Sequence, residues 1–199
     1  MSKVIHINGI PGSGKTTLVK KLNKNKNILA IDTDDISDAN EMKMLNNKKC
    51  DYLYNKKNIK KYFKLLEKEN NKSIKQIIKD NKNKIIVFAG LSIVIPNPDY
   101  GFVVKTDIDT NFKRLNLRSL EEICNQKKEI KKLLQSNIPT YKKDLLLFAK
   151  LRLHVPFATI VPDIEKRIEK IVKIAKENKF KLLKSDDIYK QIINNIKID

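Results

Sequence analysis

The stretch Gly9-Ile-Pro-Gly-Ser-Gly-Lys-Thr-Thr, residues 9–17, decides the fold of this chain. It fits the pattern G-x-x-x-x-G-K-[ST], with Gly9, Gly14, Lys15 and Thr16 at the fixed positions. Such a loop wraps around phosphates and aims its backbone N–H groups at their oxygens, which requires dihedral angles that glycine adopts easily. The lysine places a positive charge beside the β- and γ-phosphates, and the hydroxyl supplies an oxygen to Mg²⁺. The stretch therefore predicts a nucleoside triphosphate site.

The residues on either side of the loop agree with this prediction. Residues 3–8 form a short apolar run that is typical of a buried strand, and residues 17–22 place apolar side chains at helical spacing. A strand followed by a helix puts the phosphates at a helix N-terminus, where the N–H groups and the dipole favour an anion. We expect the following residues to bind the nucleotide: Gly9, Gly12, Ser13, Gly14, Lys15, Thr16 and Thr17.

The Pro-Gly-Ser-Gly-Lys-Thr-Thr form of the loop is similar to that of the P-loop kinases, which phosphorylate small molecules and nucleic acids. The chain resembles these enzymes more than it resembles GTPases or motor ATPases. The resemblance implies ATP or GTP as phosphate donor, Mg²⁺ as metal, and a parallel sheet with strand order 2-3-1-4-5.

An acidic cluster follows the second apolar run. Residues 28–32 are predicted to form a buried strand that leads into Asp32-Thr-Asp-Asp35. Because ligands bind outside the carboxyl ends of the strands in open α/β sheets, these carboxylates are expected beside the phosphates. A kinase needs a carboxylate there to orient or deprotonate the attacking hydroxyl, and oxygen ligands to hold Mg²⁺.

The acidic cluster resembles two groups of P-loop kinases. Shikimate- and gluconate-type kinases carry a D-x-D or similar pair after the second strand, and polynucleotide 5′-kinases carry an Asp-Asp pair there. Both resemblances imply that Asp34 is the catalytic base, and the first implies that Asp32 lies near the metal. The alternative role for these residues is helix capping, for which Asp35 is the stronger candidate.

Three further apolar runs complete the predicted sheet. Residues 84–90, 101–106 and 180–183 are expected strands, and they alternate with helices. The fold class is therefore α/β, a doubly wound parallel five-stranded sheet flanked by helices. The third run ends at Gly90 without an acidic residue, so a Walker B aspartate is missing and the metal role falls to Asp32 or Asp34.

The helical segment of about 36–81 is where P-loop kinases commonly hold the acceptor substrate. Met42, Met44 and Leu45 are candidates for lining an acceptor pocket. Aromatic side chains at helical spacing are more often core than base-stacking groups, so Tyr62 and Phe63 are expected in the core.

A second helical region follows the fourth strand. Asp107–Asn111 is a helix-start signal, after which Arg114 and Arg118 lie four residues apart on one helix face. In P-loop kinases a helical lid, here at about 109–155, brings arginines onto the transferring phosphoryl group. The alternative is a solvated helix face whose arginines pair with Glu121 or Glu122.

Composition limits the remaining possibilities. At 199 residues a single domain, 1–199, is expected, and no apolar run approaches the length of about 20 residues that a membrane span needs. Cys50 and Cys124 form no metal-ligand spacing, so a cytoplasmic location is expected.

The net charge of the chain is +19. This charge indicates either a nucleic-acid partner or a compositional drift toward lysine that has no functional meaning. Because only 4 of the 42 basic residues are arginine, drift is favoured.

Three functions remain open. The first is an ATP- and Mg²⁺-dependent phosphotransferase acting on a hydroxyl of a small molecule, with a nucleoside or nucleotide favoured. The second is a polynucleotide 5′-hydroxyl kinase, although those enzymes usually carry an arginine shortly after the acidic pair, where this chain has Ile36-Ser37-Asp38. The third is a nucleotide-binding protein without enzymatic activity.

Overall fold

The computed structural model describes residues 2–46, 56–90, 93, 95–107, 109–111, 113–115, 117 and 161–195. The chain divides into two compact units, one of residues 1–105 with 171–199 and the other of residues 106–170. The first unit contains the sheet and the phosphate loop, and the second follows the fourth strand. The expectation of a single domain stays a prediction.

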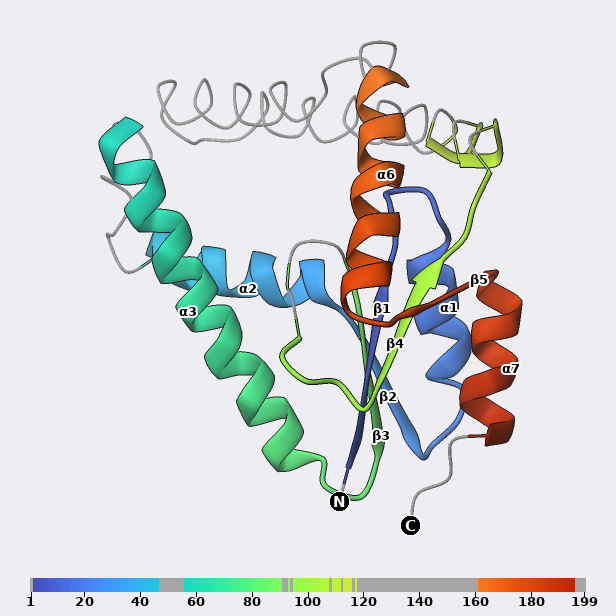
Figure 1. Ribbon diagram of the computed structural model, residues 1–199. Helices are drawn as coiled ribbons and strands as arrows, with labels where there is room; N and C mark the ends of the chain where they lie inside the picture. Colours follow the sequence, from blue (N-terminus) through green and yellow to red (C-terminus); the bar gives the residue numbers. More distant parts are fainter. Residues whose placement is uncertain are drawn as a thin grey trace, which may run out of the picture. The chain divides into compact units, whose positions relative to one another are not determined.

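Five parallel strands form the sheet of the first unit (Figure 1). They are β1 (Lys3–Asn8), β2 (Ile28–Asp32), β3 (Ile85–Ala89), β4 (Tyr100–Val104) and β5 (Lys181–Leu183). Their order is β2-β3-β1-β4-β5, so the predicted order and all five predicted strands are confirmed. In the register of the sheet, Ile85 of β3 is the partner of Lys3 on one side and Ile28 on the other.

Five helices are described. They are α1 (Lys15–Leu22), α2 (Thr33–Asn46), α3 (Lys56–Asp80), α6 (Val161–Glu177) and α7 (Ser185–Asn195). The predicted helical segment 36–81 thus contains two helices, and α1 begins at Lys15, two residues earlier than the apolar spacing indicates. Within the described residues, no helix is long and apolar enough to cross a membrane.

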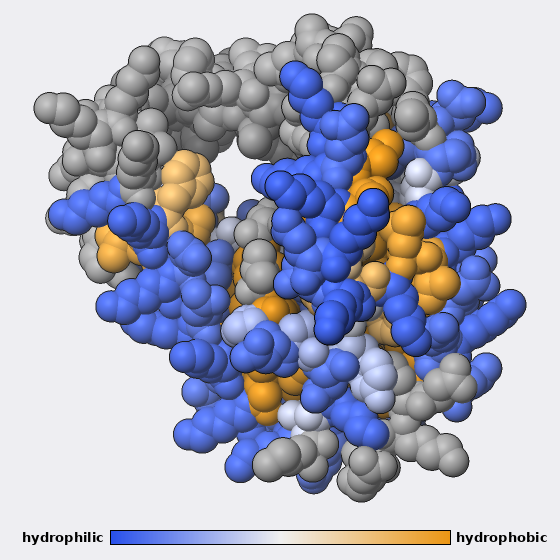
Figure 2. Space-filling model, viewed as in Figure 1, coloured by the Kyte–Doolittle hydropathy of each residue, from blue (hydrophilic) through white to orange (hydrophobic). Residues whose placement is uncertain are grey.

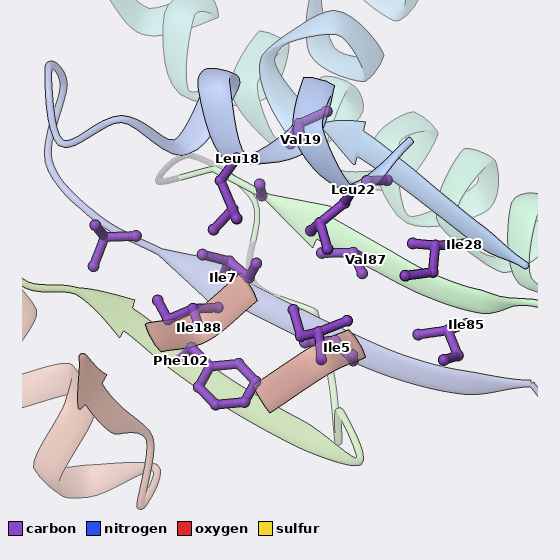
Figure 3. Close-up of a cluster of buried hydrophobic side chains, with 14 residues drawn as sticks. Ile5, Ile7, Leu18, Val19, Leu22, Ile28, Ile85, Val87, Phe102 and Ile188 are labelled. Atoms are coloured by element: carbon purple, nitrogen blue, oxygen red, sulfur yellow. The ribbon is translucent and has the colours of Figure 1, made fainter. Parts of the chain in front are cut away.

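The alternation of side chains along the strands separates the core into two layers, one on each face of the sheet. On one face, Ile5 and Ile7 of β1 pack with the apolar sides of α1 and α7 (Figure 3). Leu18 and Leu22 of α1 point toward the strands there, together with Ile188 of α7. On the other face, Ile86 and Phe88 of β3 pack with Ile36 of α2 and Ile74 of α3. A central strand such as β3 is therefore buried throughout, which explains its uninterrupted apolar sequence.

A histidine is buried in the middle of this sheet. His6 on β1 is 1% exposed, and Phe180 contacts its ring edge-on with ring centroids 5.7 Å apart. The phenyl ring reaches this position because the neighbouring β4 residue is Gly101, where a Cβ would lie 1.8 Å from the ring. Burial lowers the pKa of His6 to about 4, and a weaker backbone hydrogen bond at Gly90 opposes that effect. His6 is therefore neutral at pH 7 and packs as part of the core.

Candidate nucleotide and phosphoryl-transfer site

The loop between β1 and α1 uses glycine where the backbone requires it. Gly12 and Gly14 have positive φ values of 77° and 97°, which side-chained residues adopt only at a cost. Gly9 has a different reason, because a Cβ there would lie 2.7 Å from Oγ of Ser13. The three glycines therefore allow the tight curvature that brings backbone N–H groups to one point at the start of α1.

The remaining loop residues are held by local hydrogen bonds. Lys15 Nζ donates to the carbonyl oxygens of Gly9 at 2.6 Å and Ile10 at 3.0 Å, so its charge lies over the loop. The N–H of Ser13 donates to the carbonyl of Ile10 at 3.1 Å. Because α1 begins at Lys15, the positive end of the helix dipole lies at this loop, beside the lysine charge.

One anchor of the loop was missed by sequence reasoning. Asn8, the last residue of β1, is buried, and its Oδ1 accepts the N–H of Gly9 at 2.7 Å. This bond fixes the point where the strand turns into the loop. A polar residue at the end of an otherwise apolar strand is the signal that could have identified it.

Thr16 and Asp32 lie together. The Thr16 hydroxyl donates a hydrogen bond of 2.9 Å to Oδ2 of Asp32. Thr16 belongs to the first turn of α1, which is exposed at this point, and Asp32 ends β2. A hydroxyl and a carboxylate are hard oxygen ligands of the type that Mg²⁺ takes in proteins, so these two residues fit the metal that the sequence predicts. Within the described residues there is no group of three or more His, Cys, Asp or Glu side chains that could hold a metal by itself.

The same carboxylate caps α2. Oδ1 of Asp32 accepts the N–H of Asp34 at 3.2 Å, and α2 begins at the intervening Thr33. This is the geometry of an N-cap residue, whose side chain satisfies an N–H of the first turn. The prediction that Asp35 is the cap is therefore wrong, because the helix starts two residues before Asp35. Asp34 and Asp35 are both exposed within the first turn of α2.

A second glycine contact sets where α2 begins. Thr33 is completely buried, and its Oγ1 would lie 1.6 Å from a Cβ placed on Gly90 at the end of β3. Gly90 therefore lets the start of α2 approach the neighbouring strand closely. This approach fixes the positions of Asp32 and Asp34 on either side of Thr33, at the carboxyl end of the sheet.

The predicted lid residues belong to the second unit. Asp107 Oδ1 accepts the N–H of Thr110 at 2.7 Å, so the helix-start signal at Asp107 is confirmed. This hydrogen bond is the largest of the effects that lower the pKa of Asp107, and the charge of Arg114 is a smaller one. Arg114 is exposed on the helical segment that follows, whereas Arg118 lies outside the described residues. A lid role for the two arginines stays a prediction.

The methionines predicted to line an acceptor pocket lie elsewhere in the structure. Met44 is buried against Tyr62 and Leu66, which confirms Tyr62 as core. Met42 and Phe63 point to solvent, with 56% and 60% of their surfaces exposed, so Phe63 is not a core residue. Met44 and Met42 differ because two residues of a helix separate side chains by about 200°, which turns one inward and the other outward. Neither methionine lines the nearby groove between α2 and α3, whereas Phe63 and Leu66 do.

A comparison with protein families places this fold and loop in a known group. The family model described as "AAA domain" matches residues 5–134, which include the phosphate loop, the acidic cluster, most of β1 and all of β2, β3 and β4. The chain belongs to the AAA domain family. AAA domains are part of the P-loop NTPase superfamily, which includes kinases, so this chain is a P-loop nucleotide-binding domain. A search of the curated proteins finds no significant match to this AAA domain protein.

Proposed function

We propose that this protein is an ATP- and Mg²⁺-dependent phosphotransferase that acts on a hydroxyl of a small molecule. The observation that carries the proposal is the pair formed by the Thr16 hydroxyl and Asp32, 2.9 Å apart, with Asp34 in the first turn of the next helix. A nucleotide-binding protein without transfer needs the loop and the metal ligands. It has no use for the additional exposed carboxylate of Asp34 beside them.

Each residue has a role in this proposal. The loop N–H groups and Lys15 bind the β- and γ-phosphates, and Lys15 exchanges its bonds to the Gly9 and Ile10 carbonyls for phosphate oxygens. Thr16 and Asp32 hold the metal, which when bound neutralises charge on the phosphate oxygens. GTP is an alternative donor that the loop would also accept.

Asp34 acts on the acceptor. It accepts the proton of the acceptor hydroxyl as that oxygen forms a bond to the γ-phosphorus, and the bond from phosphorus to the β-phosphate oxygen breaks to release the diphosphate. Arg114 and Arg118 stabilise the charge on the transferring group. The missing acidic residue after β3 agrees with the metal role of Asp32, because another carboxylate must replace a Walker B aspartate.

The test is transfer of labelled γ-phosphate from ATP, with Mg²⁺, to a panel of acceptors. The panel contains nucleosides, nucleotides, hydroxylated small molecules and a 5′-hydroxyl oligonucleotide. Labelled product with a small molecule supports the proposal, and its loss in Lys15→Ala links the transfer to this loop. ATP binding without transfer to any acceptor would favour the binding-protein alternative instead.

A second candidate, a polynucleotide 5′-hydroxyl kinase, is favoured by one observation. Six exposed lysines follow one another at intervals of three or four residues along α3, which places them on one face of the helix: Lys61, Lys64, Lys68, Lys72, Lys75 and Lys79. In Figure 2 most of the side chains along this helix are hydrophilic, with some hydrophobic ones near its upper end. A row of cations suits a phosphodiester backbone, although Lys72 already pairs with Glu69 at 2.8 Å.

Salt dependence distinguishes this second candidate. If the lysine row binds nucleic acid, oligonucleotide affinity falls steeply as salt rises, and the double variant Lys64→Gln/Lys68→Gln makes the slope shallower. The matched control is Lys20→Gln/Lys24→Gln, which removes two exposed lysines from the region of α1. Equal slopes for the two variants would leave the row as a solvated helix face.

A further inference from the structure

A groove runs between α2, α3 and the segment after β3. Its volume is about 690 Å³, which is enough for a small molecule. Ser37 and Glu41 line it from α2, Glu67 and Asn70 from α3, and Ile93 and Pro96 from the segment that follows β3. All of these residues belong to the first unit, together with the phosphate loop.

The groove continues the face of α2 on which Asp34 lies. Ser37 and Glu41 are three and seven residues after Asp34, which places the three side chains in a row along one side of the helix. Ile36 and Asn40 belong to the buried side of the same helix. Asp34 does not itself line the groove, but because one helical turn rises by about 5.4 Å, a molecule in the groove that contacts Ser37 lies about one turn of α2 from Asp34. One of its hydroxyls can therefore reach the carboxylate that the proposed function makes the base.

Polar contacts between α2 and α3 hold the groove open in one shape. Asn40 Nδ2 donates to Asn70 Oδ1 at 2.9 Å and to Ser73 Oγ at 3.0 Å, and both asparagines are buried. Asn70 Nδ2 lies 3.5 Å from Ser37 Oγ, so it is only weakly bound at the groove wall. These groups fix the two helices relative to each other and present an amide and a hydroxyl to the groove.

The charge of the groove is opposite to that of the chain. The whole chain has 42 basic and 23 acidic residues, but the groove has two carboxylates, Glu41 and Glu67, against one cation, Lys75. Glu41 is half-buried and accepts a hydrogen bond from the hydroxyl of the buried Tyr62, which orients its carboxylate. No arginine is among the described residues that line the groove. The two carboxylates attract an ammonium group and disfavour a phosphate within the groove, although Lys64, Lys68 and Lys72 line an adjoining hollow that shares Glu67 and Lys75 with it.

We propose that this groove binds the phosphoryl acceptor and that the acceptor is a small hydroxylated molecule carrying an amino group and no phosphate. The apolar lining, which includes Leu66 and Ile74, contacts its carbon skeleton. Glu41 and Glu67 bind the ammonium group, and the groups at Ser37 and Asn70 bind hydroxyls. The transfer step rests on the proposed function, but the selectivity of the groove does not. This selectivity excludes a nucleotide, which was among the favoured acceptors when the sequence was considered alone.

The test measures binding to the full chain without nucleotide, so that it does not depend on catalysis. Kanamycin and glucosamine are the amine-bearing probes, glucose and sucrose are the neutral probes, and AMP and glucose 6-phosphate are the phosphate-bearing probes. We expect at least one amine-bearing probe to bind with a Kd about tenfold or more below those of the other four compounds. Non-specific attraction cannot produce this result, because a chain of net charge +19 repels cations.

Two variants assign the binding to the groove. Glu67→Gln changes an exposed residue, and Glu41→Gln keeps an oxygen that can accept the Tyr62 hydroxyl, so both are expected to fold. Each raises the Kd of the amine-bearing probe about tenfold. The matched control is Glu69→Gln, two residues from Glu67 on α3, whose carboxylate pairs with Lys72 and does not line the groove. A thermal melt of each variant checks folding.

The outcomes separate this inference from the proposed function. Tighter binding of AMP or glucose 6-phosphate, no binding of either amine-bearing probe, or equal Kd values for Glu67→Gln and Glu69→Gln each overturns the groove assignment. Transfer of phosphate to a nucleotide would support a kinase and overturn the amine selectivity. Amine binding that depends on Glu41 and Glu67, with no transfer to any acceptor, would leave the groove assignment standing and remove the proposed function.

Discussion

The Thr16 hydroxyl and the Asp32 carboxylate are joined by a hydrogen bond of 2.9 Å, although 16 residues separate them in the chain. One follows β1 and the other ends β2, and β3 lies between these two strands in the sheet. The other oxygen of Asp32 accepts the N–H of Asp34 and so caps α2. One carboxylate therefore connects the predicted metal site to the start of the helix that carries the predicted base.

The two roles of Asp32 can be separated by substitution. Asparagine is as good an N-cap as aspartate but has no charge, so Asp32→Asn is expected to keep the stability and to raise the Mg²⁺ concentration needed for half-maximal nucleotide turnover. Asp32→Ala removes both the helix cap and the carboxylate charge, and loss of the cap lowers the free energy of unfolding by about 1 kcal/mol. Denaturant unfolding and Mg²⁺ titration measure the two effects. Asp35→Ala is the control, and a larger stability loss there than in Asp32→Ala would contradict the capping assignment.

Removing the proposed base should separate chemistry from nucleotide binding. Asp34→Asn keeps the size of the side chain but cannot accept the proton of the hydroxyl, so we expect kcat to fall by about 10²–10⁴ with the Kd for ATP unchanged. The control is Asp38→Asn, four residues further along α2 and also exposed. Near-normal turnover in Asp34→Asn would show that another residue accepts the proton.

The close approach of Phe180 to β4 predicts a strong effect at Gly101. A Cβ at this position would lie 1.8 Å from the phenyl ring, so Gly101→Ala should displace Phe180 from His6 and destabilise the fold by about 1–3 kcal/mol. Combining it with Phe180→Leu should cost less than the sum of the single changes, because the smaller side chain removes part of the clash. Denaturant unfolding of the unchanged protein, the two single variants and the double variant measures this coupling. Strictly additive changes in unfolding free energy would mean that a clash with Phe180 is not the reason why Gly101→Ala destabilises the fold.

The buried His6 predicts how stability depends on pH. Its pKa is about 4 in the folded protein, whereas that of an exposed histidine is 6.5, so the unfolded chain binds more protons between these pH values. The histidine contribution is constant above pH 6.5, decreases as pH falls through this window, and levels off below about 4 with a total loss of about 3 kcal/mol.

Comparison with His6→Leu isolates this effect from that of the carboxylates. Unfolding free energies of both proteins are measured from about pH 4 to about pH 7.5, where the leucine variant should lose less stability on acidification. Parallel curves for the two proteins would mean that His6 does not titrate differently in the folded and unfolded states.

Much of the fold could be predicted because its signals are local. The strands β1, β2 and β3 are apolar runs bounded by polar residues, and a parallel strand that is buried on both faces has no other pattern available. The loop glycines could be assigned for the same reason. Gly12 and Gly14 are needed because their own backbones have positive φ, which is a local property. The strand order came from the family resemblance, and composition alone did not contain it.

The capping error and the missed lining residues of the groove have a different origin. Sequence favoured Asp35 as the cap, but the start of α2 depends on Thr33 fitting against Gly90, which lies at the end of another strand much later in the chain. The groove depends on Asn40 meeting Asn70, which are 30 residues apart. Neither contact leaves a periodic signal, because each involves a single pair of residues brought together by packing.

The sequence by itself determined the sheet, the phosphate loop and the residue types available for phosphate and metal chemistry. These follow from hydrophobic periodicity and from backbone angles, which act over a few residues. Only the tertiary structure decided that Asp32 both caps α2 and contacts Thr16, that Met42 and Phe63 face solvent, and that Glu41 and Glu67 share a groove. Those facts depend on which helix faces meet when the layers pack, and packing joins residues that are distant in the chain.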